Sequence, residues 1–340
     1  MDKSPSISLF HFNIVVGRLA NYKYFNMDQT IKNALELFDK DSPKVAVGQE
    51  LRYYTGGPEA LLQLVLAFNA WMPSRTFMTG SFNQASRWVK RGYPEVMGVS
   101  TIGANDLGKD DILIIPEVKQ CPKDLIEKGV KVFIYQLGKA NTEKNIEAGC
   151  GYISHNFWLS ENLGLNLPRS HILRPYLTKS KTNFGPIVNN NRKDIILINH
   201  DSFREKQRFE EFCQKREQPC TVTLLKGFDV DGLMDIYGMA KVMYSGCMRG
   251  SERGVLEAAL GGVLILTKDC DNAKDTRDFP LPRDHIITER NSFEDIATKM
   301  LDNFEEEQNK LEGLRHIYKK LGHQSLVKDT KSFIYAATKK

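Results

Sequence analysis

The chain has 340 residues, of which 41% are hydrophobic and 26% are charged, and its formal net charge is +5 at pH 7. This length suits two domains that each bury a core, while the mild, diffuse positive charge argues against a nucleic-acid partner. No apolar run approaches the roughly 20 residues that span a bilayer, and the first residues lack a signal-peptide core, so we expect no membrane span and a cytoplasmic location. The six cysteines show no C-x-x-C spacing, so we expect neither a zinc site nor a disulfide framework.

The first half of the chain predicts strands that alternate with helices. A segment of β character at 7–16 and a helical one at 30–38 come first. Short apolar runs typical of buried strands follow at 44–48, 76–79, 96–100, 111–116, 130–135 and 152–154. After the first of these runs, Gly56-Gly57 predicts a glycine turn, and Pro58 opens a helix over 59–71. Continuous apolar strands between helices indicate a parallel sheet covered on both faces.

Two titratable residues directly follow predicted strands of this sheet. Glu117 comes after the run at 111–116, and His155 comes after the run at 152–154. Because the ligands of parallel sheets gather at the carboxyl ends of the strands, we expect both residues on the cleft side. Glu117 is a candidate for a general base or an acceptor-binding carboxylate. His155 is a candidate base, and capping of the following helix is its structural alternative.

A polar segment at 178–192, which contains Pro186 and three consecutive asparagines, predicts an interdomain linker. A second series follows, with strands at 194–198 and 221–225, helices ending near 215 and spanning 230–238, and helical segments at 292–321 and 325–337. We therefore expect three parts, namely a first domain at 1–182, a second domain at 183–322, and a C-terminal helix at 323–340.

The stretch 243–267 predicts a strand, a glycine-spaced loop, a helix ended by Gly261-Gly262, and a second strand. A loop that leads into a helix N-terminus exposes backbone N–H groups and the positive end of the helix dipole, so it favours a pyrophosphate. Arg249 and Arg253 add positive charge there, and Glu257 lies about one and a half turns into the helix, where a carboxylate can accept hydrogen bonds from a ribose diol. Together these features predict a nucleotide site.

The run from Ser251 to Thr267 resembles the donor-binding signature of retaining glycosyltransferases of the GT-B fold, especially glycosyltransferase family 4. That family carries two glutamates with seven residues between them. Glu257, followed by alanine, matches the second glutamate, whereas Arg249 stands where the first belongs and Glu252 is the nearest carboxylate. The resemblance implies two Rossmann-like parallel-sheet domains that face each other across a cleft, with the C-terminal helix packed back on the first domain.

The activity implied by this resemblance is transfer of a hexose or pentose from a nucleotide-diphosphate sugar, with UDP favoured, to a glycan or glycoconjugate acceptor. It also implies retention of stereochemistry and a reaction without metal or cofactor. Lys206 lies in the loop-helix where that family carries an arginine and a lysine on the donor diphosphate, with Arg204 and His200 as its nearest rivals and a solvated surface lysine as the alternative. Gly227-Phe228 resembles the segment that reads the base, and a core position is the alternative for Phe228. The expected donor-binding residues are Gly56, Gly57, Arg204, Lys206, Gly227, Phe228, Arg249, Gly250, Ser251, Arg253, Gly254 and Glu257. The catalytic candidates are Glu117, His155, Arg249 and Glu252.

Several alternatives stay open. Asp229 with Asp231, and Asp269 with Asp271, are paired carboxylates like those with which metal-dependent GT-A glycosyltransferases hold a divalent ion. Since fold does not fix function, the chain is also compatible with a nucleotide-sugar epimerase or hydrolase of the same fold, or with a non-catalytic nucleotide- or glycan-binding relative. A dehydrogenase fingerprint G-x-G-x-x-G after a strand and a P-loop are both absent from the sequence.

Overall fold

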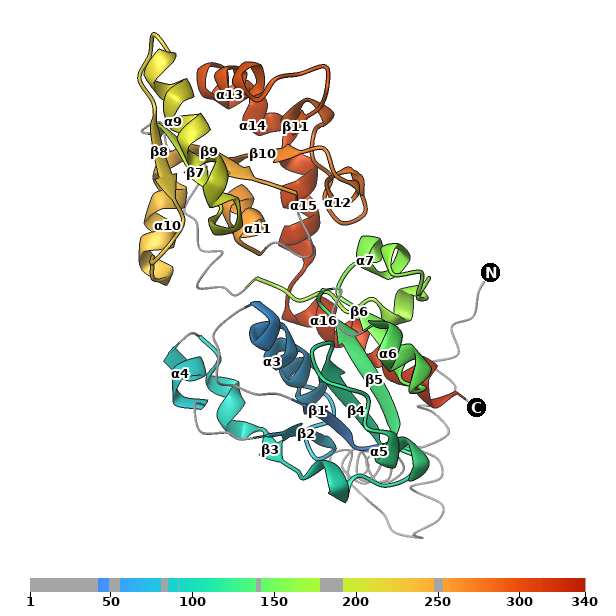
Figure 1. Cartoon of the computed structure of the whole chain (residues 1–340). Helices are drawn as coiled ribbons and strands as arrows, with labels where there is room; N and C mark the ends of the chain where they lie inside the picture. The colour runs from blue at the N-terminus through green and yellow to red at the C-terminus, as the bar shows by residue number, and fades with distance from the viewer. Residues whose placement is uncertain are drawn as a thin grey trace, which may run out of the picture.

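The computed structural model describes residues 42–48, 56–80, 85–90, 92–138, 142–177, 192–247 and 253–339. Within these ranges the strands form two separate sheets, one of six strands and one of five. Figure 1 shows the two sheets in two α/β units, one above the other, with helices packed around each sheet. The predicted fold class of two parallel-sheet units is confirmed. The expected segments at 7–16 and 30–38, and the expected boundary between 182 and 183, lie outside the described residues, so the domain division stays a prediction.

The six-stranded sheet has the strand order β3-β2-β1-β4-β5-β6, and all its pairings are parallel. Its strands are β1 (Val45–Gly48), β2 (Thr76–Thr79), β3 (Ser100–Thr101), β4 (Ile112–Pro116), β5 (Lys131–Gln136) and β6 (Gly151–Ser154). The helices described along this part of the chain are α3 (Gly56–Asn69), α4 (Ala85–Lys90), α5 (Lys123–Glu127), α6 (Thr142–Glu147) and α7 (Phe157–Asn162). The central strands β1 and β4 are almost fully buried, as expected for apolar runs covered on both faces.

The five-stranded sheet has the order β11-β10-β9-β7-β8 and is also parallel throughout. Its strands are β7 (Lys193–Ile198), β8 (Thr221–Leu224), β9 (Ala240–Ser245), β10 (Leu264–Lys268) and β11 (Ile286–Ile287). The helices described here are α9 (Lys206–Lys215), α10 (Val230–Met239), α11 (Arg253–Leu260), α12 (Asp271–Lys274), α13 (Phe293–Asp302), α14 (Phe304–Lys310) and α15 (Glu312–Lys320). Their apolar faces and this sheet share one core.

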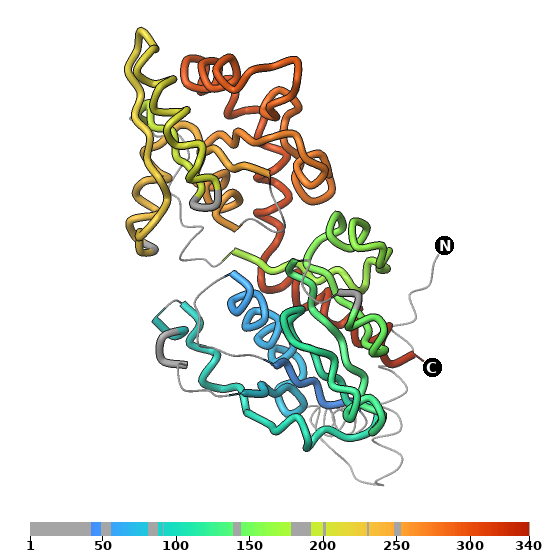
Figure 2. Tube along the Cα trace, viewed as in Figure 1, coloured from blue at the N-terminus to red at the C-terminus, as the bar shows by residue number. Residues whose placement is uncertain are grey.

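The last helix, α16 (His323–Thr338), belongs to the core of the six-stranded unit. Figure 2 traces the end of the chain, in red, from the five-stranded unit back to the other unit. Phe333 is fully buried, and its ring centroid lies 6.3 Å from that of Phe68 and 4.9 Å from that of Phe133. Trp71 of the loop after α3 donates its indole N–H to Thr330 at 3.1 Å. Aromatic packing therefore fixes α16 against α3 and β5.

The strand predicted at 96–100 is wrong over most of its length. Residues Pro94–Gly98 form a 3₁₀ helix, and only Ser100–Thr101 pair with β2. Pro94 has a fixed φ and no N–H to give to a strand ladder, so it favours the start of a helical turn. The apolar Val96 still enters the core, which explains why its hydrophobicity resembled that of a strand residue.

The cysteine expectation is also wrong. The structure pairs Cys121 with Cys150, with Cα atoms 6.1 Å apart, and Cys213 with Cys220, with Cα atoms 4.9 Å apart. Cys121 and Cys150 are separated by 29 residues in the sequence, and the fold brings them together beside β5, which spacing alone does not reveal. The cysteine pattern therefore no longer supports a reducing compartment, and the cytoplasmic location stays a prediction. Among the described residues, no helix has the length and apolar character needed to cross a bilayer.

Candidate functional site

Helix α11 carries the described part of the predicted donor motif. Its apolar positions are buried, and it ends as the sequence predicts. Gly262 has a φ of +86°, its N–H donates to the Ala259 carbonyl at 3.1 Å, and the Val263 N–H donates to the Ala258 carbonyl at 2.9 Å. This pair of hydrogen bonds is a Schellman motif, in which glycine takes the left-handed position without strain. The turn leads into β10, so the first turn of α11 lies on the carboxyl side of its sheet.

Arg253, in that first turn, reaches across to the six-stranded unit. Its Nη2 donates to Oε1 of Glu59 at 3.1 Å, and its Nη1 lies 3.1 Å from Oε2 of the same carboxylate. The side chain of Arg253 is only 10% exposed and that of Glu59 only 5%. On the other side, Nε of Arg253 lies 3.9 Å from Oε1 of the buried Glu257. One guanidinium thus stands between a carboxylate of each unit.

The first-unit side of this contact is a hydrogen-bonded network. The Tyr93 hydroxyl donates to Glu59 at 2.6 Å, and the Gln63 amide donates to the Tyr93 oxygen at 2.6 Å and to the Tyr176 carbonyl at 2.7 Å. Burial first, and the Glu59 charge second, raise the pKa of Tyr93 far above its usual value, so the hydroxyl keeps its proton and acts as a donor. The network holds Glu59 in one place, facing Arg253.

The predicted glycine turn lies next to the same arginine. Gly56 and Gly57 form the first residues of α3 rather than a separate turn, and a Cβ added at Gly56 would meet Cδ of Arg253 at 3.7 Å. The sequence-predicted Gly56 and Arg253 are therefore brought together.

Glu117 follows β4, and a Cβ added at Gly138 would lie 3.5 Å from its Oε1. Burial raises the pKa of Glu117, although backbone N–H groups, including that of Leu137, oppose the shift.

The segment with Arg204 and Lys206 lies at the carboxyl end of β7. The Gly246 N–H, just after β9, donates to the Ser202 hydroxyl at 2.7 Å, which docks this segment beside the end of β9. Arg204 is exposed, and Lys206 pairs with Glu210 at 3.0 Å on the surface of α9. Within the described ranges, neither cation makes a hydrogen bond or an ion pair with α11. The arrangement places both on the carboxyl side of the sheet without bringing them to Glu257.

The segment predicted to read the base follows β8. Gly227 has a φ of +81°, and Phe228 is 39% exposed. At this exposure, Phe228 is not a core residue. Gly254 packs in α11, where an added Cβ would lie 3.6 Å from the Tyr237 hydroxyl. Arg249, Gly250, Ser251 and Glu252 lie outside the described residues.

His155 lies at a second contact between the two units, beside residues of both. It is buried, and Nδ1 lies 2.9 Å from the Gln136 carbonyl, so Nδ1 carries the proton. Burial lowers the pKa of His155 to about 4, and Arg174 adds to the effect. The imidazole is therefore neutral at pH 7, and it lines a small cavity together with Arg174 and Tyr318. The capping alternative is not seen, because Asn156 caps α7.

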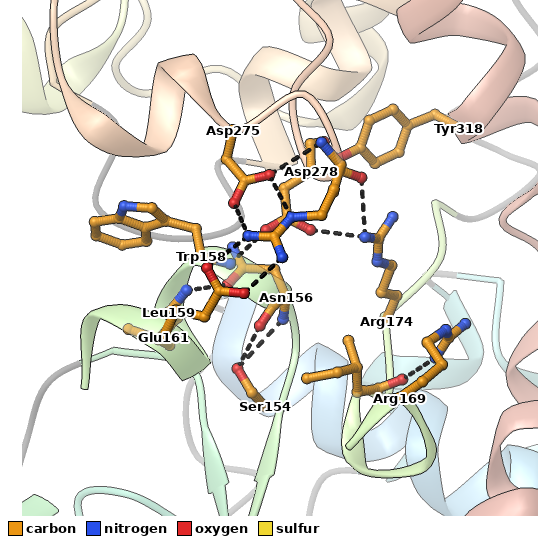
Figure 3. Close-up of polar contacts among 12 residues, drawn as sticks. Ser154, Asn156, Trp158, Leu159, Glu161, Arg169, Arg174, Asp275, Asp278 and Tyr318 are labelled. Carbon is orange, nitrogen blue, oxygen red and sulfur yellow. Dashed lines mark hydrogen bonds and ion pairs between the residues drawn. The ribbon is translucent and has the colours of Figure 1, made fainter. Parts of the chain in front are cut away.

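Asp278 is the centre of this second contact (Figure 3). Its carboxylate accepts the Arg174 guanidinium at 2.7 Å and the Trp158 N–H, at the start of α7, at 2.8 Å. Its carbonyl accepts the Tyr318 hydroxyl at 2.5 Å. Nearby, Arg277 pairs with Glu161 through two contacts of 2.5 and 2.7 Å. We call this group the Asp278 junction.

Carboxylates that could hold a metal have other partners. Asp229 caps α10 by accepting the Gly232 N–H at 2.8 Å, and Asp269 pairs with Lys274 at 2.5 Å. One cluster among the described residues has a ligand-like arrangement, and it consists of Asp284, His285 and Glu307. Lys299 and Lys310 already neutralise the two carboxylates of this cluster, at N–O distances of 2.6–3.1 Å. The cluster is an ion-pair network that ties α13 to α14.

Sequence reasoning missed Glu59 and Asp278. Glu59 and Arg253 are 194 residues apart, and a glutamate after Pro58 has the ordinary signature of a first helical turn. Asp278 follows no strand and belongs to no motif. The one usable signal was the position of Glu59 just after the predicted glycine turn, since Gly56 and Gly57 were expected to bind the donor.

No protein-family model and no curated protein matches the chain, but solved structures do. It is similar to a glycosyltransferase from Rickettsia africae ESF-5, with a TM-score of 0.58 and 12% identity over 88% of this chain and 99% of that one. AviGT4, a glycosyltransferase involved in avilamycin A biosynthesis, matches with a TM-score of 0.52 and 10% identity over 86% and 98% of the two chains.

A third match is α,α-trehalose-phosphate synthase (UDP-forming) from Burkholderia vietnamiensis, with a TM-score of 0.50 and 9% identity over 88% of this chain and 99% of that one. Identities this low show the fold alone. All three alignments run over nearly the whole of both chains, so the likeness includes both sheets. The chain therefore has the GT-B fold, with two Rossmann-like parallel-sheet units.

Proposed function

We propose that this chain is a glycosyltransferase that moves a hexose or pentose from a nucleotide-diphosphate sugar to a glycan or glycoconjugate acceptor. The observation that carries the proposal is the pair of charged residues that α11 presents. The helix presents a buried carboxylate, Glu257, and a cation, Arg253, on the carboxyl side of one sheet and against the other unit. The GT-B fold supports the proposal, because ligands of open parallel sheets bind at the carboxyl ends of the strands.

In the proposed donor complex, Glu257 accepts hydrogen bonds from the ribose diol and the start of α11 faces the diphosphate. Arg253, Arg204 and Lys206 supply positive charge to the leaving diphosphate, and each charge-assisted contact is worth about 1.5–3 kcal/mol. Gly227 and Phe228 hold the base. Side chains and a helix end can neutralise a diphosphate without a cation, so we propose metal-independent transfer, and EDTA should leave donor binding unchanged.

Glu117 is the proposed acceptor-side carboxylate. It follows β4 on the carboxyl side of the six-stranded sheet, and burial raises its pKa. In a retaining reaction of the family 4 kind, the leaving phosphate assists the acceptor on the same face, and the protein mainly stabilises charge. Glu117 then binds an acceptor hydroxyl rather than acting as an obligatory base. His155, neutral and buried at the Asp278 junction, is the weaker candidate for contact with substrate.

A panel of UDP-, GDP- and dTDP-sugars, scored by the rise in melting temperature, tests the donor class, because a ligand that binds only the native state stabilises it. UDP is the first nucleotide to test, since one of the similar structures is a UDP-forming synthase. We expect one nucleotide family to stabilise the protein and its nucleoside diphosphate to be released only after an acceptor is added. No stabilisation by any member would contradict the proposal.

The second candidate is a non-catalytic nucleotide- or glycan-binding relative, which Arg249 in place of the family's first glutamate favours. Donor binding without turnover over a broad acceptor panel would support it. Conversion of the donor sugar without acceptor would instead indicate an epimerase or hydrolase of the same fold.

A further inference from the structure

The guanidinium of Arg253 has more hydrogen-bond donors than its present partners use. Nη2 donates to Glu59, whereas Nε has no hydrogen-bond acceptor among the described residues and Nη1 faces Glu59 at 3.1 Å without the alignment of a hydrogen bond. The side chain is nonetheless nine-tenths buried. A buried guanidinium with an unmatched N–H is expected to seek a further acceptor, and a carboxylate and a phosphate oxygen engage the same fork.

This arginine also lies where an anion is favoured. It is in the first turn of α11, an eight-residue helix, whose N–H groups and dipole attract negative charge. Two carboxylates flank its guanidinium. Glu257 of the same helix lies 3.9 Å from Nε, and Glu59 of the other unit makes the closer contact, at 3.1 Å. Glu59 therefore occupies a position at this helix start that favours a negative charge.

We propose that Glu59 competes with the donor diphosphate for Arg253, so that the two units are joined by the Glu59–Arg253 ion pair until the donor takes the guanidinium. The inference rests on the proposed function, and it names a residue of the opposite unit that sets donor affinity. Glu59 lowers that affinity because the donor must displace it, and its carboxylate would also repel a diphosphate beside it.

Glu59 has a second partner that would remain after Arg253 turns to the donor. Its carboxylate also accepts the Tyr93 hydroxyl at 2.6 Å, and that hydroxyl is itself held by the Gln63 amide. After Arg253 turns to a diphosphate, Glu59 keeps this neutral donor and is not left as a bare buried charge. The Asp278 junction is a separate contact between the units, with partners of its own, so loss of the Glu59 pair does not detach them.

The test uses isothermal titration calorimetry of the full chain with UDP and with inorganic pyrophosphate. Glu59→Gln keeps the shape of the side chain and an oxygen that can accept the Tyr93 hydroxyl, but it removes the charge. We expect it to bind both probes about tenfold more tightly than the unchanged chain, a coupling of ordinary size. Glu161→Gln is the matched control, because it neutralises a different pair across the units, Glu161–Arg277, and it should leave both affinities unchanged.

The double variant Glu59→Gln with Arg253→Met separates competition from general loosening of the cleft. If the gain passes through Arg253, the double variant binds no better than Arg253→Met alone. Equal or weaker binding by Glu59→Gln, or a gain that survives Arg253→Met, would overturn the inference while nucleotide binding by the unchanged chain still stands. If neither the unchanged chain nor Glu59→Gln binds UDP, other nucleoside diphosphates or pyrophosphate, the proposed function falls with it.

Discussion

Replacing Asp278 with alanine should weaken the joint between the two units. The carboxylate is 1% exposed, its partner Arg174 is 12% exposed, and they are 2.7 Å apart. Removing it leaves a largely buried guanidinium without its counter-charge, and the Trp158 N–H without the acceptor at 2.8 Å. Loss of one partner of a buried ion pair costs about 3–5 kcal/mol. Arg174 keeps one other acceptor, the Arg277 carbonyl at 3.0 Å, so we expect the lower end, about 3 kcal/mol.

Thermal unfolding followed by circular dichroism measures this loss. For a unit of this size, about 3 kcal/mol lowers the melting temperature by about 6–12 °C. Asp278→Asn retains an oxygen for the Trp158 N–H and should cost less. Glu161→Ala is the matched control, because its pair with Arg277 is about half exposed on both sides, and exposed pairs contribute about 0–1 kcal/mol. A fall for Asp278→Ala no larger than that of Glu161→Ala would refute the buried-pair reasoning.

Two further changes test the packing and the protonation inferred above. Phe333→Ala removes a fully buried ring between α16 and α3 and should cost about 3–5 kcal/mol in urea unfolding, whereas Tyr335→Ala, on the same helix and 58% exposed, should stay within about 0.5 kcal/mol. Burial lowers the pKa of His155 from 6.5 to about 4, so His155 binds a proton less readily in the folded chain than in the unfolded chain. The folded state should therefore lose stability as pH falls from 6.5 towards 4, by up to about 3 kcal/mol. His155→Asn should flatten this part of the curve of stability against pH, and an unchanged slope would contradict the assignment.

The fold class was predictable because its signals are local. Short apolar runs between helical segments, such as 111–116, predicted strands buried on both faces, and the structure has β4 at Ile112–Pro116. The end of α11 was equally readable, since Gly262 takes a left-handed φ that other residues adopt with strain. At 96–100 the hydrophobic pattern predicted a strand, but the fixed φ and missing N–H of Pro94 favoured a 3₁₀ helix, which the structure has at Pro94–Gly98.

The contacts that join the units were not predictable. Glu59 meets Arg253 across 194 residues, and Asp278 meets Arg174 across 104, so neither pair leaves a spacing pattern. In the sequence, a glutamate in a first helical turn indicates only a favourable interaction with the helix dipole. The arrangement of the two sheets is what shows that Glu59 and Arg253 face each other. The same reason explains the disulfide between Cys121 and Cys150.

Titration of UDP into Glu257→Ala and Glu257→Gln is the most direct test of a nucleotide-sugar site at α11. Glu257 is buried, 4% exposed, beside Arg253. Loss of its carboxylate should leave the ribose diol without acceptors and cost about 1.5–3 kcal/mol, or roughly tenfold to a hundredfold in affinity, with Glu257→Gln costing less because it keeps one oxygen. Unchanged UDP affinity in Glu257→Ala, with the fold intact by circular dichroism, would contradict the assignment of the donor site to this helix.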